Sequence, residues 1–148
     1  MADIALVRSL ADMDHYAVVG TLRVSGATQA SVVTAGVAEH PLAGGPVVGF
    51  VARGRTVKLA NIRRNPRLTV VFRSGHEWVT VEGRADLIGP DDVFAGFEPE
   101  RVPQLLRDVF VAAGGTHDDW AEYDWVMAED RRCAVLVHPE RIYSRPGL

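Results

Sequence analysis

Cysteine is almost absent from this chain, because its 148 residues include only Cys133. One cysteine cannot form an internal disulfide, so noncovalent packing must hold the fold together, which fits a reducing compartment. Cysteine and histidine do not recur at zinc-site spacings, and no apolar run approaches the length of a membrane span. Since Asp3 interrupts the stretch that would have to serve as a signal peptide, we expect a cytoplasmic protein without membrane partner or bound metal.

The chain also has no excess of positive charge, because it contains 16 Lys and Arg residues and 19 Asp and Glu residues, which give a formal net charge of -3. Nonspecific nucleic-acid binding depends on neutralising many phosphates, so this charge balance argues against it. The composition is ordinary for a globular protein, with 47% hydrophobic and 24% charged residues. A chain of this length can bury one sufficient core, and we predict a single domain over residues 1–148.

What the chain does have is a cluster of basic residues where a strand changes into a helix. The apolar run from Val47 to Ala52 has the length of a strand, and a turn follows it. Thr56 is a suitable N-cap for a helix that begins at Val57, and Pro66 ends this helix. The segment therefore predicts a strand, a turn and a short helix in immediate succession.

The basic residues of this turn and helix predict an anion-binding site. A helix N-terminus offers free N–H groups and the positive end of the helix dipole, which favour a phosphate. Arg53, Arg55 and Lys58 add full charges at this place, and Lys58, Asn61 and Asn65 recur on one helical face. The alternative interpretation, a basic helix face that is only solvated, stays open at this point.

The β-branched and aromatic stretches predict a mainly β protein. The six predicted strands are His15 to Val24, Gln29 to Val37, Val47 to Ala52, Arg67 to Phe72, Trp78 to Ile88 and Cys133 to Val137. Gly83, in the middle of the fifth, indicates a β-bulge or a close backbone approach. The predicted helices are Ile4 to Leu10, Asp91 to Phe97, Arg101 to Ala113 and Asp118 to Glu129. We predict a mainly β, α+β fold: a six-stranded antiparallel barrel, closed or half open, with peripheral helices.

Motifs for covalent or metal-assisted catalysis are missing. The chain contains neither a Gly-x-Ser-x-Gly elbow nor a His-Glu-x-x-His helix motif. Its five histidines are scattered, and each is interpreted as a turn or strand residue, so no catalytic residue is predicted. A hydride transfer from a bound cofactor would need neither a nucleophile nor a metal.

Four stretches of the chain carry a resemblance to a known family: GTLRVSGATQASVV at 20–33, RGRTVKLANIRRNPRLTVVF at 53–72, WVTVEGRADLI at 78–88 and HDDWAEYDWVMAEDRR at 117–132. Lys58 to Arg67 match the specific helix motif Lys-x-x-Asn-[Leu/Ile]-Arg-Arg-[Asp/Asn]-Pro-Arg. Over nearly its whole length the chain resembles the split β-barrel flavin and deazaflavin oxidoreductases, called pyridoxamine-phosphate-oxidase-like. The residues Asp130-Arg131-Arg132, just before the last predicted strand, narrow the resemblance to the actinobacterial branch of the family that depends on coenzyme F-420. The resemblance implies a fold of the FMN-binding split-barrel type.

The resemblance also implies a homodimer whose cofactor lies in a groove between the two subunits. The strand around Val32 would run under the tricyclic ring, the basic turn would hold the phosphate and acidic tail, and Trp78 would lie on a strand that crosses to the partner subunit. Family members commonly carry an Arg where this chain has Thr56, so a hydroxyl would take its place. The implied cofactor-binding residues are Gln29, Ser31, Val32, Val33, Arg53, Arg55, Thr56, Lys58, Asn61, Trp78 and Thr80.

The activity implied by the resemblance is an oxidoreductase in which the reduced deazaflavin coenzyme F-420 donates a hydride to an unsaturated or conjugated small molecule. An FMN-dependent enzyme similar to pyridoxamine phosphate oxidase is one alternative. A non-catalytic binder of a flavin-like or haem-like ligand is another. Nucleic-acid recognition through Arg63, Arg64 and Arg67 is a third, which the acidic total charge disfavours. The sequence does not identify the substrate.

Overall fold

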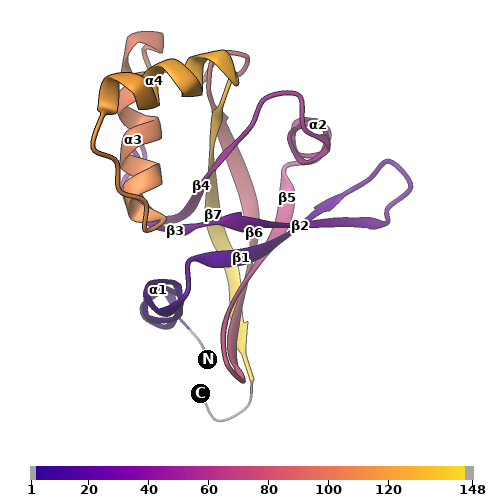
Figure 1. Cartoon of the computed structure of the whole chain (residues 1–148). Coiled ribbons are helices and arrows are strands. Elements are labelled where there is room, and N and C mark those ends of the chain that lie inside the picture. Colours follow the sequence, from indigo (N-terminus) through magenta and orange to yellow (C-terminus); the bar gives the residue numbers. More distant parts are fainter. Residues whose placement is uncertain (1–2, 146–148) are drawn as a thin grey trace.

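The structure, a computed structural model, describes residues 3–145, and this part of the chain is mainly β with helices at the periphery (Figure 1). In chain order the elements are α1 (Ile4–Met13), β1 (Tyr16–Leu22), β2 (Thr28–Thr34), β3 (Gly36–Glu39), β4 (Pro46–Ala52), α2 (Val57–Arg64), β5 (Arg67–Ser74), β6 (Glu77–Ile88), η1 (Pro99–Arg101), α3 (Val102–Ala112), α4 (Trp120–Glu129) and β7 (Cys133–Ser144). All pairs of neighbouring strands are antiparallel. The predicted mainly β, α+β class is confirmed.

The strands form one seven-stranded sheet in the order β2-β1-β5-β6-β7-β4-β3, and this sheet is not closed. The prediction of six strands is wrong, because the segment expected as one strand from Gln29 to Val37 is divided at Ala35 into β2 and β3. The two halves end at opposite edges of the sheet, where β2 pairs with β1 and β3 pairs with β4. Gly36 permits this bend, because a Cβ there would lie 1.9 Å from the carbonyl oxygen of Ala112 at the end of α3.

The segment from Asp91 to Phe97 is the second correction, since it forms turns and not the predicted helix. Asp91 and Asp92 are held by Arg131 and Arg63, and a β-bridge joins Gly89 to Asp92. These tertiary ion pairs compete successfully with a local helical pattern. Residues 91–97 therefore follow the end of β6 as an irregular loop.

Two apolar clusters lie on opposite faces of the sheet at β7. Cys133, Val135 and Val137 join the larger cluster with α1 and α2, whereas Ala134 and Leu136 join a second cluster with α3 and α4. Strand β7 is thus buried on both faces, which explains why its first five residues are uniformly apolar instead of alternating. Figure 1 shows α3 and α4 together at the upper left, with α1 below them and α2 at the right.

Two local predictions are confirmed in detail. Helix α2 spans Val57–Arg64, so it begins at the predicted residue and ends just before Pro66. The pairing of β6 with β7 shifts register between Glu82 and Gly83, which is the predicted bulge. A Cβ on Gly83 would lie 1.9 Å from the carbonyl oxygen of His138, so only glycine permits this approach. Within residues 3–145, no helix has the combined length and apolar character needed to cross a membrane.

Candidate functional site

The basic turn between β4 and α2 packs directly against the loop that joins α4 to β7. The N–H of Gly54 donates to the carbonyl oxygen of Asp130 at 3.0 Å. A Cβ on Gly54 would lie 2.7 Å from the carbonyl oxygen of Arg131, so the two loops approach this closely only because residue 54 is glycine. We call the two segments together, residues 53–58 and 130–132, the cradle. It joins charges that are more than 70 residues apart in the sequence.

Lys58 is the cradle residue with the most unusual environment. Its side chain is half-buried, and within residues 3–145 it makes no ion pair and no hydrogen bond. Burial, and then the positive charge of Arg132, lower the pKa of Lys58 from its usual 10.5. A half-buried ammonium group without a carboxylate is electrostatically unfavourable, and an anion beside it would remove this penalty.

The acidic groups of the cradle do not balance its cations. Asp130 is shared by two arginines: its Oδ1 accepts from Arg53 at 3.4 Å, and its Oδ2 accepts from Arg132 at 3.1 Å. Arg55 is exposed and has a left-handed backbone conformation, with φ of 64°. A cavity of about 230 Å³ opens between the loops, lined by Arg53, Gly54, Arg55, Glu129, Asp130 and Arg131. Positive charge therefore exceeds negative charge where the sequence predicts an anion site.

Thr56 occupies the predicted N-cap position of α2 but does not cap the helix with its side chain. Its hydroxyl donates instead to the carbonyl oxygen of Arg53 at 3.0 Å, and no side-chain cap bond is made to the first turn. In the described part of the chain, the first N–H groups of α2 thus have no side-chain acceptor, which suits an external anion.

Asn61 lies on the buried face of α2, so the predicted polar stripe of Lys58, Asn61 and Asn65 does not form. The Asn61 amide donates to Thr21 Oγ1 at 3.1 Å, and Thr21 in turn donates to Gln29 Oε1 at 3.2 Å. This hydrogen-bonded chain joins α2 to β1 and β2 inside the fold. The predicted cofactor roles of Asn61 and Gln29 remain predictions, and their side chains are engaged in this internal link.

Strand β2 divides its predicted ring-contacting residues between two faces. Ser31 pairs with Val19, whose side chain is fully buried, and Gln29 and Val33 lie on the same, more buried face of β2 as Ser31. Within the described residues, Ser31 Oγ is buried without a hydrogen-bond partner. Val32 points outward and is 63% exposed. Because β2 is an edge strand, the backbone N–H and C=O groups on its outer side are not paired with a neighbouring strand of the described sheet.

The outward face of the sheet brings Val32 together with Thr80. Cross-strand register aligns Val32, Val18, Val71, Thr80 and Tyr143 in one row over five strands. Trp78 packs edge-on against Tyr143, with ring centroids 6.2 Å apart, and Thr80, which pairs with Tyr143, is buried. The predicted pocket residues Trp78 and Thr80 thus lie on the same face of the sheet as Val32, with Trp78 half-buried and Thr80 buried, and this face is separate from the cradle.

The structure contains a cluster of His40, Asp86 and His138 that was not predicted from the sequence. Both histidine Nε2 atoms contact Asp86 Oδ2, at 2.9 Å for His40 and 2.6 Å for His138. The spacing would suit a metal ion, but His40 Nδ1 accepts the N–H groups of Leu42 and Ala43. The ring proton therefore sits on Nε2 and donates to Asp86, so His40 offers no lone pair to a metal. No local spacing could reveal this cluster, because its members are about 50 residues apart.

Cys133 and Tyr123 are buried, and burial raises the pKa of both side chains. Burial raises the pKa of the Cys133 thiol far above its ordinary value, so it is not a nucleophile at neutral pH. Burial also raises the pKa of Tyr123 to about 12, and its hydroxyl donates to the carbonyl oxygen of Leu106 at 2.9 Å. Tyr123 therefore packs in the core, while Trp125 on the same helix is 65% exposed.

Comparisons with solved structures agree with this architecture. A conserved hypothetical protein from Mycobacterium tuberculosis superimposes with a TM-score of 0.71 at 18% identity, covering 97% of this chain and 84% of that one. A protein described as an F-420 reductase gives 0.62 at 16% identity, with coverage of 92% and 94%. An FMN-binding, pyridoxamine 5'-phosphate oxidase-related protein from Nostoc punctiforme gives 0.63 at 14% identity, with coverage of 95% and 81%. At such identities these likenesses establish the shared fold alone.

A comparison of the sequence with family models gives a more direct assignment. The model described as pyridoxamine 5'-phosphate oxidase matches residues 6–144 and so includes every strand, the cradle and the outward face. The seven-stranded antiparallel sheet with helices on its periphery is the split-barrel architecture of that flavin-binding family. On this evidence of sequence and fold together, the chain belongs to the pyridoxamine 5'-phosphate oxidase family.

Proposed function

We propose that this protein is an oxidoreductase that uses the reduced deazaflavin coenzyme F-420 to reduce an unsaturated or conjugated small molecule. The observation that carries the proposal is the cradle, where Lys58 is half-buried without an acidic partner among residues 3–145 and Asp130 is shared by two arginines. A coenzyme with a phosphate and an acidic tail supplies the missing negative charge. The likeness to a protein described as an F-420 reductase supports this choice within the family.

In this proposal the cradle binds the anionic part of the coenzyme through Arg53, Arg55, Lys58 and the free N–H groups at the start of α2. The backbone of β2 around Ser31 and Val32 bonds the edge of the ring, because this edge strand has unpaired N–H and C=O groups. The bound coenzyme supplies the hydride. The protein orients the acceptor against the ring and excludes water.

The proposal includes a homodimer with the coenzyme groove at its interface. The outward face carries exposed apolar side chains, since Tyr16 is 67%, Val18 is 45% and Val32 is 63% exposed. Contiguous apolar surface of this kind is typical of an interface. A second copy would cover this face and bring its Trp78 and Thr80 toward the ring.

An FMN-dependent reaction is the second candidate, because a solved structure of the same fold is described as FMN-binding. FMN also carries a phosphate that the cradle can hold, so the cradle alone does not distinguish the two cofactors. Titration of the purified protein with F-420 and FMN side by side separates them. We expect tighter binding of F-420.

The matched pair of variants for this titration is Lys58→Ala and Arg8→Ala. Both remove one positive charge, but Arg8 lies on the exposed side of α1. We expect Lys58→Ala to weaken coenzyme binding at least about tenfold, since hydrogen bonds to charged groups contribute roughly 1.5–3 kcal/mol, and Arg8→Ala to leave it unchanged. The proposal fails if neither coenzyme binds or if Lys58→Ala binds as well as the unmodified protein. Reduced coenzyme that binds but is never oxidised by enones or quinones would indicate a carrier.

A further inference from the structure

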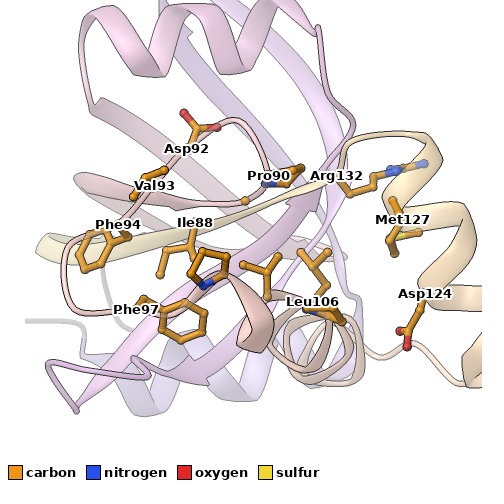
Figure 2. A pocket seen from close by; sticks show the side chains of 15 residues that line it. Ile88, Pro90, Asp92, Val93, Phe94, Phe97, Leu106, Asp124, Met127 and Arg132 are labelled. Atoms are coloured by element: carbon orange, nitrogen blue, oxygen red, sulfur yellow. The ribbon is translucent and has the colours of Figure 1, made fainter.

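A second cavity, of about 270 Å³, lies between the loop that follows β6, helix α3 and helix α4 (Figure 2). Its walls are mostly apolar and include Phe94 and Phe97 of the loop, Leu106 of α3 and Met127 of α4. Its volume approaches the lower end of the range for small-molecule pockets, about 300 Å³. None of the residues that the sequence predicts to bind the coenzyme lines this cavity.

Polar contacts hold the walls of this cavity in place from outside. Asp92 of the loop accepts two hydrogen bonds from Arg63 of α2, at 2.8 and 2.7 Å. Asp124 of α4 accepts two from Arg107 of α3, at 2.9 and 2.6 Å. The loop and both helices are thus fixed independently of any ligand. A preformed apolar cavity loses little conformational freedom when it binds a molecule.

These contacts also settle which charged side chain remains available to a ligand. Asp92 and Asp124 line the cavity, but both carboxylates are already occupied by arginines. Arg132 also lines it, and its Nε and Nη2 reach a single oxygen of Asp130, at 3.3 and 3.1 Å. Its Nη1 makes no hydrogen bond within residues 3–145, and Asp130 is shared with Arg53. Arg132 therefore keeps both a free donor and incompletely neutralised charge.

The cavity has two chemically different ends. Figure 2 shows Phe94 and Phe97 at one end and Arg132 with Met127 at the other. We propose that this cavity binds a small, largely apolar molecule with one anionic group, such as an aromatic carboxylate. The apolar body lies against Phe94, Phe97 and Leu106, and Arg132 binds the anion. The site shares Arg132 with the cradle, while its apolar walls lie outside the cradle.

Two probes of nearly equal shape test the proposal, the anion 2-naphthoate and the neutral 2-naphthamide. Each is titrated into the full chain without coenzyme, and methyl resonances are followed by NMR. We expect the largest shifts at Leu106 and Met127, with Val18 and Val32 on the outward face unchanged. We also expect naphthoate to bind about tenfold more tightly than the amide, because a charge-assisted hydrogen bond to Arg132 is stronger than a neutral one.

Three variants separate the two parts of the proposal. Arg132→Gln should reduce the preference for naphthoate to near unity while the amide binds as before. The control is Arg8→Gln, which removes one positive charge from an exposed position on α1, away from the cavity wall, and should keep the full preference. Met127→Trp, which fills the cavity, should weaken both probes at least about tenfold by loss of apolar contact.

The proposal is overturned if the probe shifts map to the outward face, or if Arg8→Gln and Arg132→Gln have equal effects. Equal affinity of the two probes for the unmodified protein also overturns it. Because these measurements use wild-type shifts as well as variants, misfolding of one variant does not decide the outcome. Failure of F-420 or FMN to bind would contradict the coenzyme proposal and leave the naphthoate result untouched.

Discussion

Charged side chains are arranged differently in the cradle and in the helical cap, by which we mean α3, α4 and residues 89–98. In the cap, Asp124 is paired with Arg107, and Asp92 is paired with Arg63 of α2, each through two hydrogen bonds. In the cradle, Lys58 has no acidic partner within the described residues, and Arg53 and Arg132 compete for one aspartate. Paired charges hold elements of the cap in position, while the unbalanced charges of the cradle favour an incoming anion.

The difference matters because an unpaired, half-buried cation destabilises the protein that carries it. Such a penalty is removed when a ligand supplies the opposite charge, so the cradle gains most from binding. The cap gains nothing electrostatically from an anion at its pairs. Variants of the two regions should therefore divide into those that change binding and those that change stability.

The largest effect is expected from Gly54→Val, which would push the two loops of the cradle apart. Its side chain would meet the carbonyl oxygens of Arg131 and Asp130, because even a Cβ would lie 2.7 and 2.9 Å from them. We expect a loss of about 3 kcal/mol in the free energy of unfolding and at least about tenfold weaker coenzyme binding. Urea denaturation and coenzyme titration measure the two.

Gly45→Ala is the control for this variant. Gly45 lies in an exposed turn with φ of 82°, and a methyl group at this position would meet no atom within 4 Å. Only backbone strain should therefore appear, at a cost of about 1 kcal/mol in the free energy of unfolding. Coenzyme affinity should not change in this control. If both variants bind coenzyme equally, the close approach of the two loops is not what builds the cradle.

Alkaline pH should destabilise the cap through Tyr123. Burial raises the pKa of Tyr123 to about 12 from 10.0, so its contribution is complete below pH 10 and is lost as the pH rises toward 12. We expect wild type to lose about 1 kcal/mol relative to Tyr123→Phe between pH 9 and pH 11. Chemical denaturation across this range measures it. A constant difference between the two proteins would show that Tyr123 ionises as freely when folded as when unfolded.

A double-mutant cycle on Arg107 and Asp124 should isolate a smaller stabilisation in the cap. Both side chains are 29% exposed, and the pair has two short hydrogen bonds, so we expect a coupling free energy of about 1 kcal/mol. The changes are Arg107→Gln, Asp124→Asn and both together, compared by thermal and urea unfolding. Coenzyme affinity should remain that of wild type, and any tenfold loss would contradict the separation of the two regions.

The smallest effect is expected from Lys58→Met in the absence of coenzyme. The pKa of Lys58 is lowered by burial and by Arg132, so the folded state releases this proton at a lower pH than the unfolded state. Stability of wild type relative to Lys58→Met should therefore rise with pH up to about 10.5 and then level off. This sign is opposite to that of Tyr123. Bound coenzyme should flatten the curve, since an anion favours the charged lysine.

Local chemistry explains which predictions from the sequence are confirmed. Helix α2 begins after Thr56 and ends before Pro66, although Thr56 makes no side-chain cap bond, and Gly83 marks the bulge, because the proline ring and the missing Cβ act within a few residues. The helix expected from Asp91 to Phe97 failed because ion pairs to distant arginines outweighed its periodicity. The division of one predicted strand at Ala35 depended on α3, whose last turn approaches Gly36.

The candidate site shows the same limit. Arg53, Arg55 and Lys58 could be proposed from the sequence, because the charges stand at a strand-to-helix turn. The sequence could not predict that these residues contact or influence Asp130 and Arg132, or that Asn61 points inward. Both properties depend on how separate elements pack. The apolar cavity and the cluster of Asp86 with two histidines likewise have no local signature.

The sequence by itself determined the mainly β character, the short basic helix that begins at Val57 and the family to which the chain is similar. These properties follow from side-chain periodicity, caps and turn residues, which act over a few positions. Only the tertiary structure decided which charges are paired and which are left open. Ion pairing depends on distances of a few ångströms between residues far apart in the chain, and only packing sets those distances.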